Sequence, residues 1–198
     1  MSEITIQEIH EQCLVTTQQV IDGFGWNSIS VGVLSNKDKR RLTQGIESSI
    51  LNWPWAMLHY RGSVEEGILD ISLKIITRDN PDSLHAVILC KYDWRREQFS
   101  ICMLENFIAY EETILTGNVL TIALIYATTF CSIAELEEIF IQDPTPEAAP
   151  RYRSYGFAQV FHDHCKMSAE VADIWKMIQT KVQNINMNDE QQAPAKLS

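Results

Sequence analysis

The chain has 198 residues, of which 45% are hydrophobic and 21% charged, with 8 glycines and 6 prolines. This composition is typical of a folded globular domain and excludes collagen-like, low-complexity and wholly disordered chains. Sixteen Lys and Arg residues against 26 Asp and Glu residues give a net charge of −10. Because such a charge repels phosphate backbones and anionic lipid headgroups, we expect no nucleic-acid partner and no membrane partner.

Hydrophobic spacing predicts the elements of the first half of the chain. Apolar residues at helical spacing predict an N-terminal helix over 4–20, then a short strand over 28–34. A second helix over 37–53 is predicted to end before Pro54, because the residue ahead of a proline is disfavoured in the α conformation. From Ile68 the period changes to two, which predicts a three-stranded antiparallel meander. Its strands are expected at 68–75, 84–92 and 99–107.

An uncharged segment at 113–134 could be mistaken for a membrane span. The break at Thr116-Gly117-Asn118 leaves about 16 helical residues, or roughly 24 Å, which is shorter than the ~30 Å hydrocarbon core of a bilayer. Both flanks are acidic, so neither end offers the usual basic anchor. We therefore predict a buried helix over 119–134. Because it joins two strands, it implies a right-handed crossover and a parallel pairing of the strand at 138–142.

The C-terminal third is predicted to hold a short helix that ends at Gly156, a strand over 157–161, and an amphipathic helix capped by Ser168. The polar residues 184–198 are predicted to form a disordered tail. The fold class is therefore mixed α/β (α+β). A single domain over 1–183, including the N-terminal helical segment, would have a mostly antiparallel central sheet with one parallel pair and helices on both faces.

The cysteines indicate the expected compartment. They are odd in number and show no CxxC spacing, and Glu3 and Glu8 stand where a signal peptide would carry basic residues. We therefore expect a cytoplasmic protein whose cysteines act as small apolar side chains. His162, His164 and Cys165 are soft ligands, but no fourth ligand follows at a characteristic spacing, so no metal site is expected. The five cysteines are Cys13, Cys90, Cys102, Cys131 and Cys165.

The order of elements, together with Tyr152-Arg153-Ser154-Tyr155-Gly156-Phe157, resembles the GNAT superfamily of acyl-CoA-dependent N-acyltransferases. That family carries Tyr-x-x-x-Gly-Phe where its fourth helix meets the next strand. The resemblance covers roughly 28–161 and implies acetyl-CoA as the donor and an amine as the acceptor. In the family, the pyrophosphate lies on N–H groups at the start of the central helix, which is favourable for any anion. The matching positions are Thr116, Gly117, Asn118 and Val119.

This phosphate loop departs from the family pattern Gln/Arg-x-x-Gly-x-Gly/Ala. Only Gly117 matches, since Ile114 replaces Gln or Arg and Val119 replaces the small residue. A valine would crowd amides that must approach a phosphate closely. The resemblance therefore leaves open a divergent or inactive member of the superfamily, with an ordinary loop at Gly117.

Two residues are candidates for acid–base catalysis. Tyr152 matches the general acid that returns a proton to the CoA thiolate in the family, and the alternative is a tyrosine packed between helix and sheet. Glu105 shares the face of apolar strand residues, where a carboxylate is costly unless it is paired or functional. It is the candidate general base, and the alternative is an exposed or Arg-paired position at the end of the strand.

The aromatic run over 53–60 supplies candidate substrate-binding residues, namely Trp53, Trp55 and Tyr60. Aromatic side chains dominate ligand and partner pockets, although such a cluster also occurs as a plug between helix and sheet. The main hypothesis is an N-acetyltransferase for a cationic amine such as a polyamine, an aminoglycoside or a Lys-rich peptide. The alternatives are an inactive protein of the same fold and an acidic adaptor or chaperone that binds a protein partner through its cleft and aromatic patch.

Overall fold

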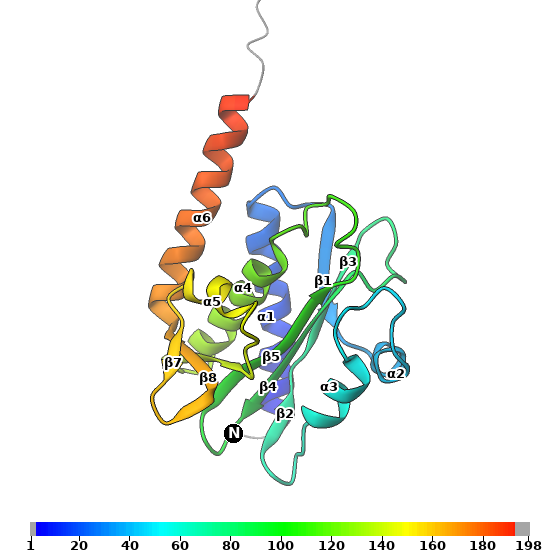
Figure 1. Ribbon diagram of the computed structural model, residues 1–198, viewed down its shortest axis with the longest axis vertical. Coiled ribbons are helices and arrows are strands. Elements are labelled where there is room, and N and C mark those ends of the chain that lie inside the picture. The colour runs from blue at the N-terminus through cyan, green and yellow to red at the C-terminus, as the bar shows by residue number, and fades with distance from the viewer. Residues whose placement is uncertain (1–2, 193–198) are drawn as a thin grey trace, which may run out of the picture.

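The computed structural model describes the backbone of residues 3–192 and the side chains of residues 5–184. Its centre is an eight-stranded sheet with the order β1-β3-β4-β5-β6-β8-β7, in which β2 also pairs with β4 (Figure 1). All pairings are antiparallel except that of β5 with β6, so the predicted fold class is confirmed. The strands are β1 (Ile29–Val33), β2 (Ile68–Asp70), β3 (Leu73–Thr77), β4 (Ala86–Asp93), β5 (Gln98–Asn106), β6 (Glu138–Gln142), β7 (Ala158–Val160) and β8 (Asp163–Glu170).

Helices cover both faces of this sheet, each over its own apolar cluster. On one face α1 and α6 flank α4, and their apolar side chains share the larger core. On the other face α2 and α3 cover β3, β4 and β5 over a smaller core (Figure 1). The helices of the described residues are α1 (Glu3–Gly23), α2 (Asn36–Gln44), α3 (Trp53–His59), α4 (Val119–Ile133), α5 (Ala149–Arg153) and α6 (Val171–Gln192).

Helix α4 is apolar on nearly every side because it lies between the sheet and two other helices. The prediction of a buried helix beginning at Val119 is confirmed, as is the parallel pair that it connects. Within the described part of the chain, no helix has both the length and the apolar character needed to cross a bilayer.

A buried histidine joins α1 to α4. The Nδ1 atom of His10 lies 2.6 Å from the hydroxyl oxygen of Tyr126, and His10 is only 2% exposed. Burial lowers the pKa of His10 from 6.5 to about 4. Below pH 6.5 the His10 imidazole is protonated in the unfolded chain, whereas it stays neutral in the folded chain. Stability from this site is therefore complete above pH 6.5 and is lost as the pH falls towards 4.

We expect this histidine alone to lower the free energy of unfolding by about 2 kcal/mol between pH 7 and pH 5. Urea unfolding at the two pH values checks this. The His10→Gln variant keeps a polar partner for Tyr126 but does not titrate, so its loss of stability should be smaller by about that amount. Equal losses in both proteins would contradict the prediction.

The region before Pro54 differs from the prediction of one helix over 37–53. Helix α2 ends at Gln44, and the chain continues without regular structure before α3 begins at Trp53. Pro54 lies in the first turn of α3, where a missing N–H removes no intrahelical hydrogen bond. The prediction was wrong because this proline starts a helix.

The predicted strand over 68–75 is divided into β2 and β3. Between them, the Ser72 hydroxyl donates to the Cys90 carbonyl at 3.2 Å and accepts from the Cys90 N–H at 3.0 Å. The Ile71 N–H still donates to the Cys90 carbonyl at 3.1 Å, and the Ser72 hydroxyl takes the place of a backbone acceptor for the Cys90 N–H. Both short strands therefore pair with β4.

The C-terminal prediction missed β8. Ser168, predicted as a helix cap, lies inside this strand opposite Phe140 and Ala158, so that prediction was wrong. Helix α6 begins at Val171 and continues to Gln192, so residues 184–192 of the predicted disordered tail are helical. Residues 193–198 of that tail lie outside the described residues.

Candidate functional site

The parallel strands β5 and β6 pair over only part of their length. The last paired residues are Ile101 and Ile141, while β5 continues as far as Asn106. Just beyond this point Cys102 forms a bulge, because β4 pairs with Ile101 and then with Met103. A bulge takes backbone polar groups out of the ladder, and bulges are frequent beside active sites. We call this opening, together with the first turn of α4, the fork.

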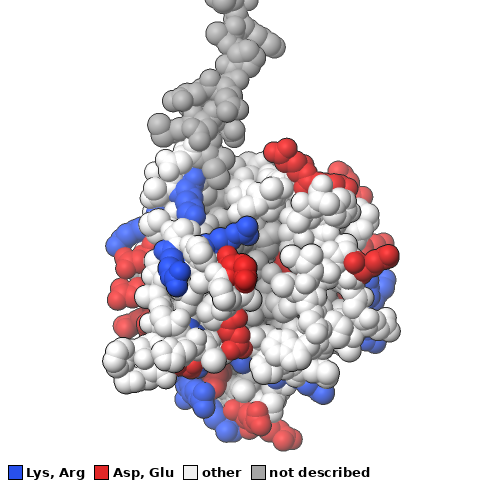
Figure 2. All heavy atoms as spheres, in the orientation of Figure 1, with Lys and Arg blue, Asp and Glu red and all other residues white. Residues whose placement is uncertain are grey.

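The start of α4 presents free backbone N–H groups at the fork. The first turn of any helix leaves its amides without intrahelical partners, and no described side chain caps this one. The Asn118 side chain instead donates to the Ile114 carbonyl at 2.8 Å. Gly117 adopts φ +76 with open space where a Cβ would lie. The face shown in Figure 2 is hollowed near its centre, where Figure 1 places α4 beside α5.

Val119 does not close this end of the helix. Its side chain is 5% exposed and belongs to the larger core, so it points into the protein. The crowding expected from the sequence therefore does not arise from this side chain. Backbone N–H groups at a helix start that no described side chain caps by a hydrogen bond fit the pyrophosphate of a CoA molecule.

Tyr152 lies on α5, partly buried against the larger core, with its ring edge-to-face on Phe157. Its hydroxyl makes no hydrogen bond to any described residue, whereas the nearby Tyr155 hydroxyl lies 2.6 Å from the Thr121 hydroxyl. Burial raises the pKa of Tyr152 above its usual value, although the Arg151 charge opposes this. Tyr152 therefore keeps its proton at neutral pH and has a free hydroxyl with which to donate it.

Glu105 is buried, and its carboxylate is surrounded by donors. It accepts hydrogen bonds from the Ser49 hydroxyl at 2.7 Å, the Ile50 N–H at 2.7 Å and the Trp53 indole N–H at 2.6 Å. These bonds tie the segment before α3 to β5 and differ from the expected alternatives, exposure or pairing with Arg. A carboxylate with three donors already bound is arranged as a structural acceptor.

The three predicted substrate-binding aromatics lie in different environments. Trp53 is fully buried in the smaller core, and Tyr60 is 7% exposed. Trp55 is 48% exposed and stacks on His59 with 4.3 Å between ring centroids. Only Trp55 and the polar edge of Tyr60 are therefore placed to contact another molecule.

Two residues that the sequence analysis did not single out join this aromatic group. The Tyr60 hydroxyl donates to the Asp143 carboxylate at 2.8 Å, and His59 Nε2 lies 3.9 Å from the same carboxylate. Asp143 directly follows β6, two residues past the last pair with β5, and adopts φ +49. A non-glycine residue in this strained region is a frequent feature of functional sites. The group Trp55, His59, Tyr60 and Asp143 is called the aromatic–acid cluster below.

Among the described residues, the cysteines and the pair His162 and His164 form neither a reactive-thiol site nor a metal site. Four cysteines are buried and Cys165 is exposed, and burial raises the pKa of Cys102 to about 12, so its thiol stays protonated. Among the described side chains, no three His, Cys, Asp or Glu residues come together as metal ligands. His162, His164 and Cys165 lie at or in β8 and form no such group.

No protein-family model and no curated protein matches this chain. Solved structures match its fold. The AtaTR complex bound with AcCoA is 11% identical, and the match covers 76% of this chain and 98% of that chain with a TM-score of 0.52. The KacTA–DNA complex is 9% identical, with 77% and 99% covered and a TM-score of 0.54. A chimera of the Vibrio cholerae spermidine N-acetyltransferase SpeG and hSSAT is 11% identical, with 75% and 99% covered and a TM-score of 0.51.

These matches define the class of fold. The chain has the fold of the GNAT acetyltransferases, and the predicted resemblance is confirmed at that level. The fork, where the pairing of β5 with β6 ends beside the start of α4, belongs to this common fold.

Proposed function

We propose that this protein is an acetyl-CoA-dependent N-acetyltransferase. The observation that carries the proposal is the fork, where β5 and β6 part beside an uncapped helix start. The loop residues Thr116, Gly117, Asn118 and Val119 would border the pyrophosphate, with the Val119 side chain in the core. The Thr116 and Asn118 N–H groups already donate to the Thr113 and Leu115 carbonyls, so the donors would be the N–H groups of Gly117, Val119 and the rest of the first turn of α4. The departure from the family pattern at Ile114 removes a polar side chain and leaves these amides in place.

When bound, acetyl-CoA would supply an activated acetyl thioester for attack by an amine. Tyr152 holds the proton that the departing sulfur requires, and its hydroxyl has no competing partner among the described residues. Glu105 was the expected base, but its carboxylate is engaged by three donors, so we assign it to holding α3 on the sheet.

The acceptor side is proposed to be the aromatic–acid cluster. A carboxylate beside exposed aromatic rings attracts ammonium groups by charge and by cation–π contact. Lys91 already places its ammonium group 5.5 Å from the centre of the Tyr60 ring. A cationic amine, such as a polyamine, an aminoglycoside or a Lys-rich peptide, fits this chemistry and the net charge of −10.

A protein-binding role is the second candidate. Trp55 and Ile50 are large apolar side chains exposed near the same helix, which is typical of a partner surface. The AtaT toxin, 10% identical with a TM-score of 0.50, is bound to the C-terminus of its antitoxin AtaR in one solved structure. A protein partner bound at Trp55 of this chain would be compatible with a fork that binds acetyl-CoA and also with one that does not.

The test of the proposed function is a titration with acetyl-CoA, by calorimetry and by thermal unfolding. At ~100 times the dissociation constant, we expect about 2.7 kcal/mol of stabilisation and a rise in Tm of roughly 5–10 °C. In Asn118→Asp, the favourable charge at the helix start is opposed by loss of the side-chain hydrogen bond to the Ile114 carbonyl, so the stability of the free protein should change by less than about 1 kcal/mol. The same charge repels pyrophosphate, so the affinity for acetyl-CoA should fall about tenfold.

The matched control is Asn80→Asp, which adds the same charge at the exposed turn between β3 and β4. It should bind acetyl-CoA as the wild type does. If millimolar acetyl-CoA causes no shift in the wild type, the acetyltransferase proposal fails and the protein-binding role takes precedence. If both variants lose affinity equally, the pyrophosphate does not lie at the start of α4.

A further inference from the structure

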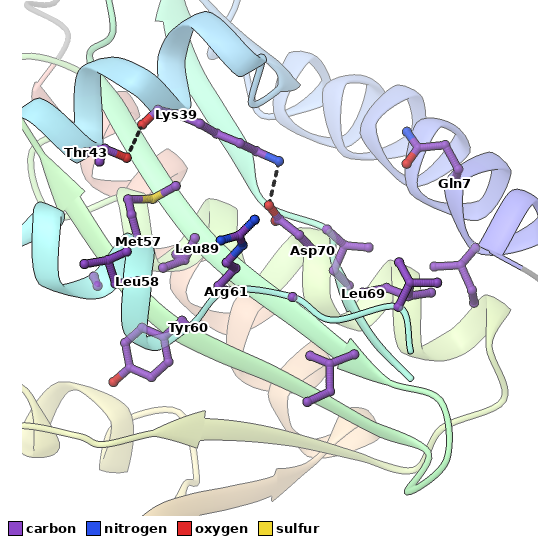
Figure 3. A pocket seen from close by; sticks show the side chains of 16 residues that line it. Gln7, Lys39, Thr43, Met57, Leu58, Tyr60, Arg61, Leu69, Asp70 and Leu89 are labelled. Atoms are coloured by element: carbon purple, nitrogen blue, oxygen red, sulfur yellow. Dashed lines mark hydrogen bonds and ion pairs between the residues drawn. The ribbon is translucent and has the colours of Figure 1, made fainter. Parts of the chain in front are cut away.

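A separate cavity of about 490 Å³ lies between α2, α3 and β2, away from the fork (Figure 3). This volume lies in the usual range for small-molecule sites. Tyr60 borders it, but its hydroxyl points away from the cavity, towards Asp143 (Figure 3). The apolar side chains that line it include Ala56, Met57, Leu69, Ile71 and Leu89.

The charged residues that line this cavity are Lys39, Arg61 and Asp70. Lys39 is paired with Asp70 at 2.7 Å, and the Asp70 carboxylate also accepts from the Ser72 N–H at 2.9 Å. Burial alone would raise the pKa of Asp70, but these donors hold it below its usual value, so the carboxylate stays ionised and paired. One positively charged side chain of this lining therefore has no acidic partner among the described residues.

That charge belongs to Arg61. Its guanidinium makes no hydrogen bond, ion pair or ring contact with any described residue, and Figure 3 shows it extending into the cavity between Leu89 and Asp70. Arg61 is exposed at the mouth of the cavity, and its guanidinium is available to a ligand there. The planar guanidinium has five N–H donors, and two of them can bind both oxygens of a carboxylate at once.

The backbone that carries Arg61 is held against β2. A Cβ at Gly62 would lie 3.0 Å from the Ile68 carbonyl oxygen and 3.1 Å from the Asp70 nitrogen, so any larger residue would have to push β2 away by a few tenths of an ångström. Ser63 then forms a bridge with Ile68. Arg61 therefore extends from a fixed backbone, which lowers the ordering cost of binding.

We propose that this cavity binds a small amphipathic carboxylate, with its anionic head on Arg61 and its apolar body on the floor formed by Met57, Leu69 and Leu89. A single negative charge matches the single unpaired cation of the described lining, whereas a phosphate dianion would require Lys39 to leave Asp70. The site shares no residue with the fork, and it meets the aromatic–acid cluster only at Tyr60, whose hydroxyl points away from the cavity. The proposal therefore goes beyond the acetyltransferase function and does not depend on it.

The test uses sodium octanoate as the probe, titrated calorimetrically into the full chain. We expect Arg61→Gln to weaken octanoate binding roughly 10- to 100-fold, because a charge-assisted hydrogen bond is lost. The matched control is Arg40→Gln, an exposed arginine on α2 that does not line the cavity. It should bind as the wild type does. Circular dichroism confirms that both variants are folded.

Two further probes separate the head from the body of the ligand. Butyrate carries the same charge with less apolar surface, and octylamine carries the same tail with the opposite charge, so both should bind more weakly than octanoate. Any of three results would overturn the proposal: no octanoate binding to the wild type, equal binding to Arg61→Gln, or octylamine binding as tightly as octanoate. Displacement of octanoate by equimolar inorganic phosphate would show a phosphate site instead and would also overturn it.

Discussion

Replacing Tyr152 by phenylalanine is expected to lower kcat by roughly 10²- to 10⁴-fold while leaving the protein folded. The proposed reaction expels a thiolate that must be protonated, and a phenylalanine ring would fill the same space without a proton to give. Since the Tyr152 hydroxyl bonds to no described residue, its removal leaves no buried partner unsatisfied. Stability should therefore change by less than about 1 kcal/mol.

The measurement is the release of CoA thiol from acetyl-CoA with spermidine, an aminoglycoside or a Lys-rich peptide as the acceptor. Tyr155→Phe is the matched control three residues away. It breaks the hydrogen bond with Thr121, so it should cost about 1 kcal/mol of stability yet keep most of the turnover. Unchanged kcat in Tyr152→Phe would remove this tyrosine from the mechanism, and no turnover with any of these amines would contradict the proposed acceptors.

The second large effect concerns stability. We expect Glu105→Ala to lower the free energy of unfolding by about 3 kcal/mol or more, because three donors lose one buried acceptor together. The cost is greatest at the Trp53 indole N–H, since this side chain is fully buried. Urea unfolding measures the change. Glu65→Ala, at an exposed carboxylate, should change stability by less than about 0.5 kcal/mol.

Glu105→Gln distinguishes an anchor from a general base. The amide oxygen can still accept from Trp53, while its NH₂ group meets a donor, so we expect a loss of about 1–2 kcal/mol. Turnover at a temperature where the variant is folded should stay within about tenfold of the wild type. A stable Glu105→Gln protein with kcat reduced more than about 100-fold would show that Glu105 is the base after all.

The elements predicted correctly from the sequence are those in which one local signal dominates. Helix α4 has no competing pattern, and the alternation along β5 places its apolar residues on one face. The boundaries that failed depend on contacts with distant residues. Ser72 interrupts a strand through Cys90, and Ser168 pairs with Phe140 although its local context is that of a helix cap.

The candidate site divides in the same way. Tyr152 and Gly117 could be found because they lie in short patterns. His59 and Asp143 are 84 positions apart and meet only because the C-terminal end of α3 lies beside the residue that follows β6, so spacing alone could not join them. Asp143-Pro144 after an apolar strand was a usable local signal for a polar residue at a strand end. The three donors on Glu105 were likewise invisible, because their loop was predicted as a helix.

The packing of α1 against α4 has a consequence for synthesis of the chain. Helix α1 ends at Gly23, and α4 begins at Val119, about 96 residues later. At ~5–20 residues per second, the ribosome needs roughly 5–20 s to make that stretch. During this time Ile6, Cys13 and Ile21 lack the α4 side chains that they pack against, and His10 remains in water until Tyr126 is made. The first helix to leave the ribosome can contact β1 early, but the part of its apolar face that α4 covers is available to chaperones until α4 is made.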